Sequence, residues 1–125
     1  MKISGFTFSK NGNKLYYPII ESILSIIDLV DEFVVVLGDS EADDNTEFQI
    51  RALNNAKIKI IKTVWDLEKF PGGTIYAHQT NLAKNACTGD WLFYLQGDEV
   101  VHERYLDKIK VTCEQQYERS EVEGI

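Results

Sequence analysis

The chain has 125 residues, of which 44% are hydrophobic, and it carries a formal net charge of -7. This length suits one domain with a single well-filled core. The acidic charge argues against a nucleic-acid backbone or an anionic membrane as partner, because both require clustered lysine and arginine.

The two cysteines, Cys87 and Cys113, have neither metal-binding nor disulfide-framework spacing, so we expect both to be reduced core residues. The N-terminus lacks the long apolar segment of a secretory signal. Four acidic residues interrupt the apolar stretch from Ile19 to Leu37. We therefore expect a cytoplasmic protein without a transmembrane segment.

Apolar runs predict four strands, and amphipathic stretches between them predict helices. In chain order, we expect a strand over 3–8, a helix over 16–30, a strand over 33–37, a short helix from 45 or 46 to about 55, a strand over 57–64, a helix over 75–87, a strand over 91–95 and a helix over 103–118. This alternation predicts an α/β fold, a Rossmann-like, doubly wound, mostly parallel sheet with helices on both faces. The run from Trp91 to Leu95 is typical of a strand covered on both faces.

Acidic residues follow two of these strands. Asp98 and Glu99 follow the Trp91 run after Gln96 and Gly97, and Asp39 follows the second strand. The carboxyl ends of strands form the ligand crevice in such sheets, so Asp98 and Glu99 are candidate ligands of a hard metal ion. Asp39 can accept hydrogen bonds from a base or a ribose, or it can bond the backbone of its own turn.

Several common chemistries of α/β proteins have no support in this chain. It contains no GxGxxG segment after the first strand, no GxxxxGK[ST] segment and no GxSxG segment, which argues against a dinucleotide site, a P-loop and a hydrolase nucleophile. The two histidines, His78 and His102, are not spaced as a zinc pair.

Three segments, in order, resemble glycosyltransferase family 2, the nucleotide-diphospho-sugar transferases of the GT-A fold. They are Phe8 to Gly12 after the first strand, Val34 to Thr46 around the second strand end, and Gly89 to Glu99, which closes in a variant of the family's D-x-D motif. The resemblance implies that Asp39 contacts the base or the ribose. It also implies that Phe8 and Asn11 lie in the loop that covers the base, and that Gln79 and Asn81 approach the diphosphate.

The same resemblance implies a divalent metal, Mn or Mg. Asp98 matches the second acid of D-x-D and would bind this ion, with Glu99 as a second ligand. Gln96 replaces the first acid. Its amide can still accept a hydrogen bond from the nucleotide, but it neutralises less charge, so we expect weaker metal binding than in a complete D-x-D site.

The resemblance further implies inverting transfer of a sugar, such as a hexose, from a UDP- or GDP-linked donor to an acceptor that the sequence does not identify. It assigns no catalytic base. Family members continue past the metal motif into an acceptor-binding part. We therefore expect residues 1–125 to be the nucleotide-sugar-binding domain alone, truncated at the start of a further strand over 121–125. The sheet edge left exposed would then favour homo-oligomers.

Two other functions fit parts of the pattern. One is a nucleotide-binding scaffold without turnover. The other is a receiver-like signalling domain, which has similar length and layer order but needs an acid pair after the first strand and a phospho-accepting Asp after the third. Here those positions hold Ser9-Lys10-Asn11 and Trp65-Asp66, which supply one of the three acids.

Overall fold

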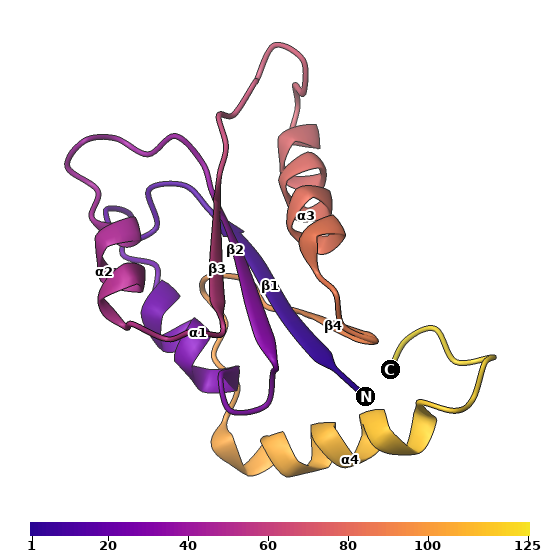
Figure 1. Ribbon diagram of the computed structural model, residues 1–125. Coiled ribbons are helices and arrows are strands. Elements are labelled where there is room, and N and C mark those ends of the chain that lie inside the picture. The colour runs from indigo at the N-terminus through magenta and orange to yellow at the C-terminus, as the bar shows by residue number, and fades with distance from the viewer.

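The computed structural model describes residues 1–125 as a four-stranded parallel sheet flanked by helices (Figure 1). The elements in chain order are β1 (Ile3–Ser9), α1 (Ile19–Ile26), β2 (Glu32–Leu37), α2 (Thr46–Ala52), β3 (Ile58–Lys62), α3 (Thr74–Ala86), β4 (Trp91–Tyr94), the short 3-10 helix η1 (Glu103–Tyr105) and α4 (Leu106–Gln116). This alternation confirms the predicted α/β class. The first helix begins later than expected because Tyr16 has a positive φ of 63° and Pro18 precedes the first helical residue.

The strand order is β3-β2-β1-β4, and all neighbours are parallel. The chain thus winds outward from β1 to β3 and then returns to the other side of β1, which confirms the doubly wound arrangement. A receiver domain has β1 between β2 and β3 instead. The receiver alternative is therefore wrong, because here β1 lies between β2 and β4.

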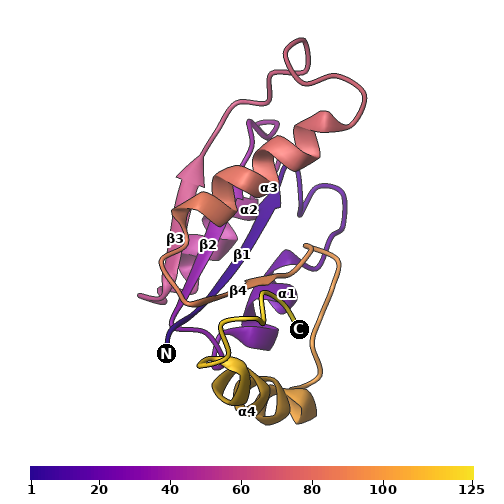
Figure 2. The ribbon, with the colours of Figure 1, turned by 90° about the vertical axis from the view of Figure 1, so that its right-hand side faces the viewer.

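Two apolar layers hold the helices against the sheet. The larger layer joins α1, α2 and α4 to one face and includes Ile23, Phe33, Ile50 and Cys113. The smaller layer lies under α3 and contains Phe6, Val34, Val36 and Ala83. Figure 2 shows α3 lying across one face of the sheet, with α1 and α2 behind the sheet. Helices on both faces are thereby confirmed.

The expectation that the Trp91 strand is covered on both faces is wrong. Trp91 and Phe93 pack toward α4 and the larger layer, whereas Leu92 and Tyr94 are 38% and 39% exposed on the other face. The reason is that α3 crosses over β1 and β2 and leaves β4 uncovered on its side. β4 is also an edge strand, since only β1 pairs with it.

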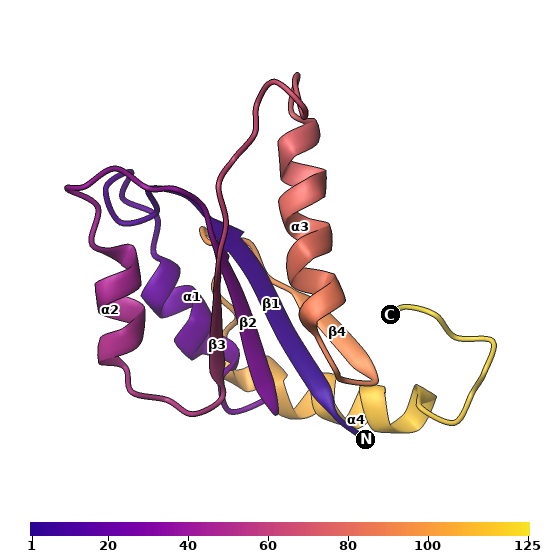
Figure 3. The same cartoon turned by 45° about the horizontal axis from the view of Figure 1, so that its top comes forward.

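The residues after α4 form no further strand, so the expected strand over 121–125 is not present. Instead the chain turns back from α4 toward β4 (Figure 3). Residues 122–125 line a hollow together with Trp91, Leu92 and Phe93. None of the α-helices has the length and apolar character that crossing a bilayer requires.

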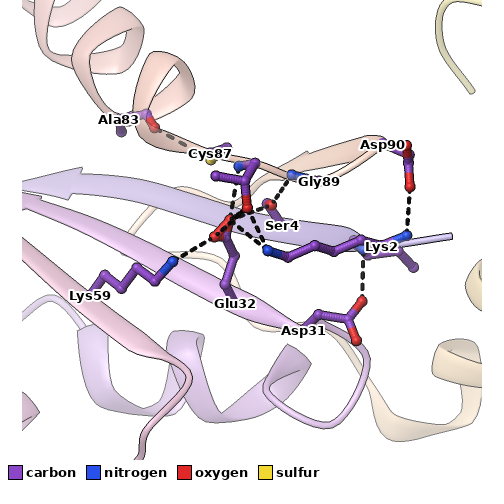
Figure 4. Close-up of polar contacts among 11 residues, drawn as sticks. Lys2, Ser4, Asp31, Glu32, Lys59, Ala83, Cys87, Gly89 and Asp90 are labelled. Carbon is purple, nitrogen blue, oxygen red and sulfur yellow. Dashed lines mark hydrogen bonds and ion pairs between the residues drawn. The ribbon is translucent and has the colours of Figure 1, made fainter.

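The buried carboxylate of Glu32 links neighbouring strands at the end of the sheet where the strands begin, near the N-terminus (Figure 4). Glu32 is 2% exposed and accepts hydrogen bonds from the Ser4 hydroxyl at 3.0 Å and from the Thr88 amide and hydroxyl at 2.8 and 2.6 Å. Its second oxygen is 3.1 Å from Lys59 Nζ. Burial alone would raise the pKa of Glu32, but these bonds outweigh it and lower the pKa to about 2.

The cysteines are confirmed as unpaired. Cys113 is buried, and Cys87 is half-buried with its thiol donating to the Ala83 carbonyl at 3.3 Å. Burial raises the pKa of Cys87 to about 11, so its thiol stays protonated at neutral pH.

Candidate functional site

A cavity of about 510 Å³ opens at the carboxyl ends of β1 and β4. This is the point where the winding of the sheet reverses, the usual ligand position in doubly wound folds. Its lining comes from the last residues of β1 and β4, from the segments that follow β1, β3 and β4, and from the first turn of α3: Phe8, Ser9, Lys10, Asn11, Leu15, Tyr17, Trp65, Tyr76, Tyr94, Gln96, Gly97 and Asp98. Four of the eight predicted site residues, Phe8, Asn11, Gln96 and Asp98, are therefore brought together here.

Aromatic rings form one wall of the cavity. Phe8 lies 6.2 Å from Trp65 and 6.1 Å from Tyr76 between ring centroids, and Trp65 meets Tyr76 edge-on at 5.8 Å. Tyr94 is stacked on Phe6 at 5.2 Å. Such rings offer flat, polarisable surfaces, which suit a planar heterocycle.

Trp65 is held in place by the segment that follows β2. Its indole lies against Gly38, where any Cβ would overlap the ring. Its backbone N–H donates to Asp39 Oδ1 at 2.9 Å. This bond, helped by Lys10, lowers the pKa of Asp39. The indole Nε1 is buried without a hydrogen-bond partner.

Asp39 stands at the border of the cavity. It lines a neighbouring hollow of about 490 Å³, while Lys10 lines the cavity itself. The two side chains are joined by an ion pair of 3.6 Å between Lys10 Nζ and Asp39 Oδ1. The Lys10 ammonium also lies 5.2 Å from the centre of a Trp65 ring, a cation–π distance.

Asn11 has a structural task in addition to its place in the cavity wall. It adopts a positive φ of 55°. Its side-chain Oδ1 accepts a hydrogen bond from the Glu41 backbone N–H at 2.7 Å, and its own backbone N–H donates to Ser40 Oγ at 2.9 Å. These bonds tie the loop after β1 to the loop after β2. The cavity rim is thus preorganised at this point.

The turn after β4 presents one carboxylate to the cavity. Glu99 folds back so that its Oε1 accepts a hydrogen bond from the Gln96 backbone N–H at 2.9 Å. Its own backbone N–H donates to the Gln96 backbone carbonyl at 3.0 Å. Glu99 does not line the cavity, whereas Asp98 does. No group of three or more His, Cys, Asp or Glu side chains is arranged to hold a metal ion. A single carboxylate fits a divalent ion only where phosphate oxygens supply further ligands, as is common for Mg²⁺.

Gln79 and Asn81 do not reach the cavity. Gln79 is fully buried, its Oε1 accepts from Thr63 Oγ1 at 2.7 Å, and its Nε2 has no partner. Asn81 is exposed and lies outside the lining. Residues two apart on a helix point to nearly opposite sides, so the two side chains could not both face one ligand. The structure thus gives no support to their predicted diphosphate contacts.

Several residues of the lining were not predicted from the sequence, above all Lys10, Trp65, Tyr76 and Tyr94. One signal was present. Lys10, Trp65 and Tyr94 each lie at or just after the end of a predicted strand, which places them at the same edge of the sheet. Tyr76 shows no comparable signal, because its position depends on how α3 lies on the sheet.

No protein-family model and no curated protein matches this chain. Among solved structures, the fold matches residues 1-349 of S. aureus TarS with a TM-score of 0.63 and 21% sequence identity, over 94% of this chain and 33% of that chain. The same part of TarS matches in complex with UDP-GlcNAc (TM-score 0.62, 21% identity, 94% and 32% covered) and with UDP (0.63, 20%, 94% and 33%). The chain thus spans about a third of the length of these TarS chains, and the likeness confirms the predicted GT-A type fold.

Proposed function

We propose that this chain binds a nucleoside-diphosphate sugar and forms the donor-binding part of a glycosyltransferase. The observation that carries the proposal is the aromatic-walled cavity at the reversal point of the sheet, with Asp98 as its one carboxylate. The comparison adds support, because TarS, which shares the fold, was crystallised with UDP-GlcNAc and with UDP.

The chemistry of the lining suggests how such a donor would lie. The base and ribose would occupy the side formed by Phe8, Asn11 and Trp65, where flat apolar surface meets hydrogen-bonding groups. The diphosphate would lie toward Asp98. A Mn or Mg ion held by Asp98 together with the phosphates would supply positive charge to them. Gln96 would add a neutral hydrogen bond on the same side.

For catalysis, the proposal is inverting transfer in which an acceptor hydroxyl attacks the anomeric carbon and the nucleoside diphosphate leaves. The described residues contribute to the leaving-group side: they bind and orient the donor. Asp98 is the only carboxylate in the cavity lining, and it is assigned to the metal. The base that takes the acceptor proton is thus not assigned to any residue of this chain.

Thermal unfolding with and without ligand tests donor binding. UDP or GDP should raise the melting temperature of the parent, since ligand at a hundredfold excess over Kd stabilises by about 2.7 kcal/mol. Manganese should enlarge this effect in the parent but not in Asp98→Asn. The control is Asp107→Asn, which removes a carboxylate from the first turn of α4 and should keep the manganese effect. Equal enhancement in Asp98→Asn would remove Asp98 as the metal ligand. A parent that responds to no nucleoside diphosphate would refute the proposed function.

A binding scaffold without turnover remains the second candidate, because one cavity carboxylate does not supply both a metal ligand and a base. The two functions differ in turnover. Release of UDP from UDP-GlcNAc, faster in the parent than in Asp98→Asn, would favour the enzyme. Saturable binding with no release would favour the scaffold.

A further inference from the structure

The loop between β1 and α1 closes with the hydrogen bonds of a Schellman motif. The Tyr16 backbone N–H donates to the Asn13 carbonyl at 3.0 Å, and the Tyr17 backbone N–H donates to the Gly12 carbonyl at 2.9 Å. Tyr16 occupies the left-handed position of this motif, with a φ of 63°. Glycine or asparagine usually fills this position, because the backbone crowds the Cβ of a larger residue there. The turn would therefore form more readily with either of them than with tyrosine.

The fold does not compensate Tyr16 for this conformation. Its side chain is 92% exposed, so it gains almost nothing from packing. Residues other than glycine that hold a left-handed conformation cluster at ligand sites, where the side chain serves binding and not stability. Tyr16 is therefore a candidate ligand contact just outside the cavity lining.

The two neighbours of this exposed tyrosine belong to the cavity. Leu15 and Tyr17 line it and are 54% and 48% exposed. The first turns of α1, which follows directly, are fastened to the turn after β4, because Ser22 Oγ donates to the Gln96 backbone carbonyl at 3.1 Å. The same turn carries Asp98. The loop thus borders the cavity on the side of Asp98, where the proposed function puts the diphosphate.

The charges around this loop favour a neutral group. Lys14 precedes Leu15 and is paired with both Glu41 and Asp43, so one cation stands against two carboxylates. A further anionic group would be repelled here. Two tyrosines and a leucine offer apolar surface with hydroxyls at its border. This surface suits a hexose, because the ring of a hexose has apolar C–H faces and a polar edge.

We infer that Leu15, Tyr16 and Tyr17 form the subsite for the hexose of the donor. This inference rests on the proposed function. A hexose bonded to the diphosphate begins next to the phosphates, so it reaches the loop that borders Asp98. Leu15 and Tyr17 would contact it from the cavity wall, and Tyr16 would lie against its solvent side. The left-handed turn at Tyr16 is then kept for sugar binding at a cost to stability.

Calorimetric titration with UDP and UDP-GlcNAc tests the inference, because the two ligands share the nucleotide and differ in the sugar. Tyr17→Ala and Tyr16→Asn should each weaken UDP-GlcNAc binding by about three- to tenfold, the effect of one aromatic contact, and leave UDP binding within about twofold. Tyr16→Phe keeps the ring and should bind both ligands as the parent does. Phe48→Ala is the matched control, because Phe48 is an aromatic residue of α2 that is 75% exposed and lies outside the cavity lining.

Thermal unfolding without ligand tests the cost of the turn at Tyr16. Tyr16→Asn should raise the melting temperature by about 2–5 °C, because asparagine adopts the left-handed conformation more readily than tyrosine. A melting temperature below that of the parent would show that Tyr16 stabilises the fold, and would overturn the inference that this residue is kept for a ligand.

The outcomes separate the inference from the proposed function. If Tyr17→Ala and Tyr16→Asn weaken UDP and UDP-GlcNAc to the same degree, or weaken neither, the inference is overturned while nucleotide binding stands. If the parent binds GDP more tightly than UDP, GDP and GDP-mannose take the place of the two ligands, with the same expected results. A parent that binds no nucleoside diphosphate refutes the proposed function itself.

Discussion

Replacement of the buried Glu32 by glutamine should destabilise the protein in a pH-dependent way. The pKa of Glu32 falls from an ordinary value of 4.5 to about 2 in the fold. At about 1.4 kcal/mol for each pKa unit, this corresponds to about 3 kcal/mol of stability. Because the folded pKa is the lower one, the stabilisation is fully present above pH 4.5 and is lost as the pH falls toward 2.

Glu32→Gln keeps the shape of the side chain but removes its charge, so the bonds from Thr88, Ser4 and Lys59 lose their charged acceptor. Urea unfolding of parent and variant should therefore differ by about 2–3 kcal/mol at pH 7 and converge near pH 2. Glu118→Gln, an exposed residue just after α4, is the control and should change little. A difference between parent and Glu32→Gln that stays constant from pH 7 to pH 2 would refute the assignment of this stability to the ionised carboxylate.

Three further predictions concern the cavity and the sheet edge. Asp39→Ala should bind UDP about 10- to 100-fold more weakly while remaining folded, as calorimetry can measure, and parent-like affinity would remove Asp39 from the site. Gly38→Val should displace the Trp65 indole, destabilise the fold by about 1–3 kcal/mol and alter tryptophan fluorescence, whereas an unchanged spectrum would contradict the packing described here. We also expect the chain to self-associate through the edge of β4, so that light scattering shows oligomers for the parent and fewer for Leu92→Lys; a monomeric parent would exclude this.

Local patterns along the chain were enough to predict the class and order of the elements. The apolar run from Phe33 to Leu37, with three consecutive valines, predicts a buried strand, and all six residues of β2 are buried in the structure. The acidic residues at strand ends were also predicted as site residues from the sequence, because parallel strands bring their carboxyl ends to one edge of the sheet. Strand-end geometry predicted a site position for Asp98, whereas the resemblance to glycosyltransferase family 2 implied site positions for Phe8, Asn11 and Gln96; all four line the same cavity.

The direction of single side chains depended on tertiary packing. Leu92 and Tyr94 belong to an apolar run yet are partly exposed, because α3 covers β1 and β2 and not β4. Gln79 faces the core and not the cavity, since the rotation of α3 about its axis is set by the residues packed beneath it. Trp65 joins the cavity only because Gly38, from a different strand end, leaves room for its ring. Sequence periodicity encodes which elements form, whereas these contacts join residues distant in the chain and are decided by how the elements pack.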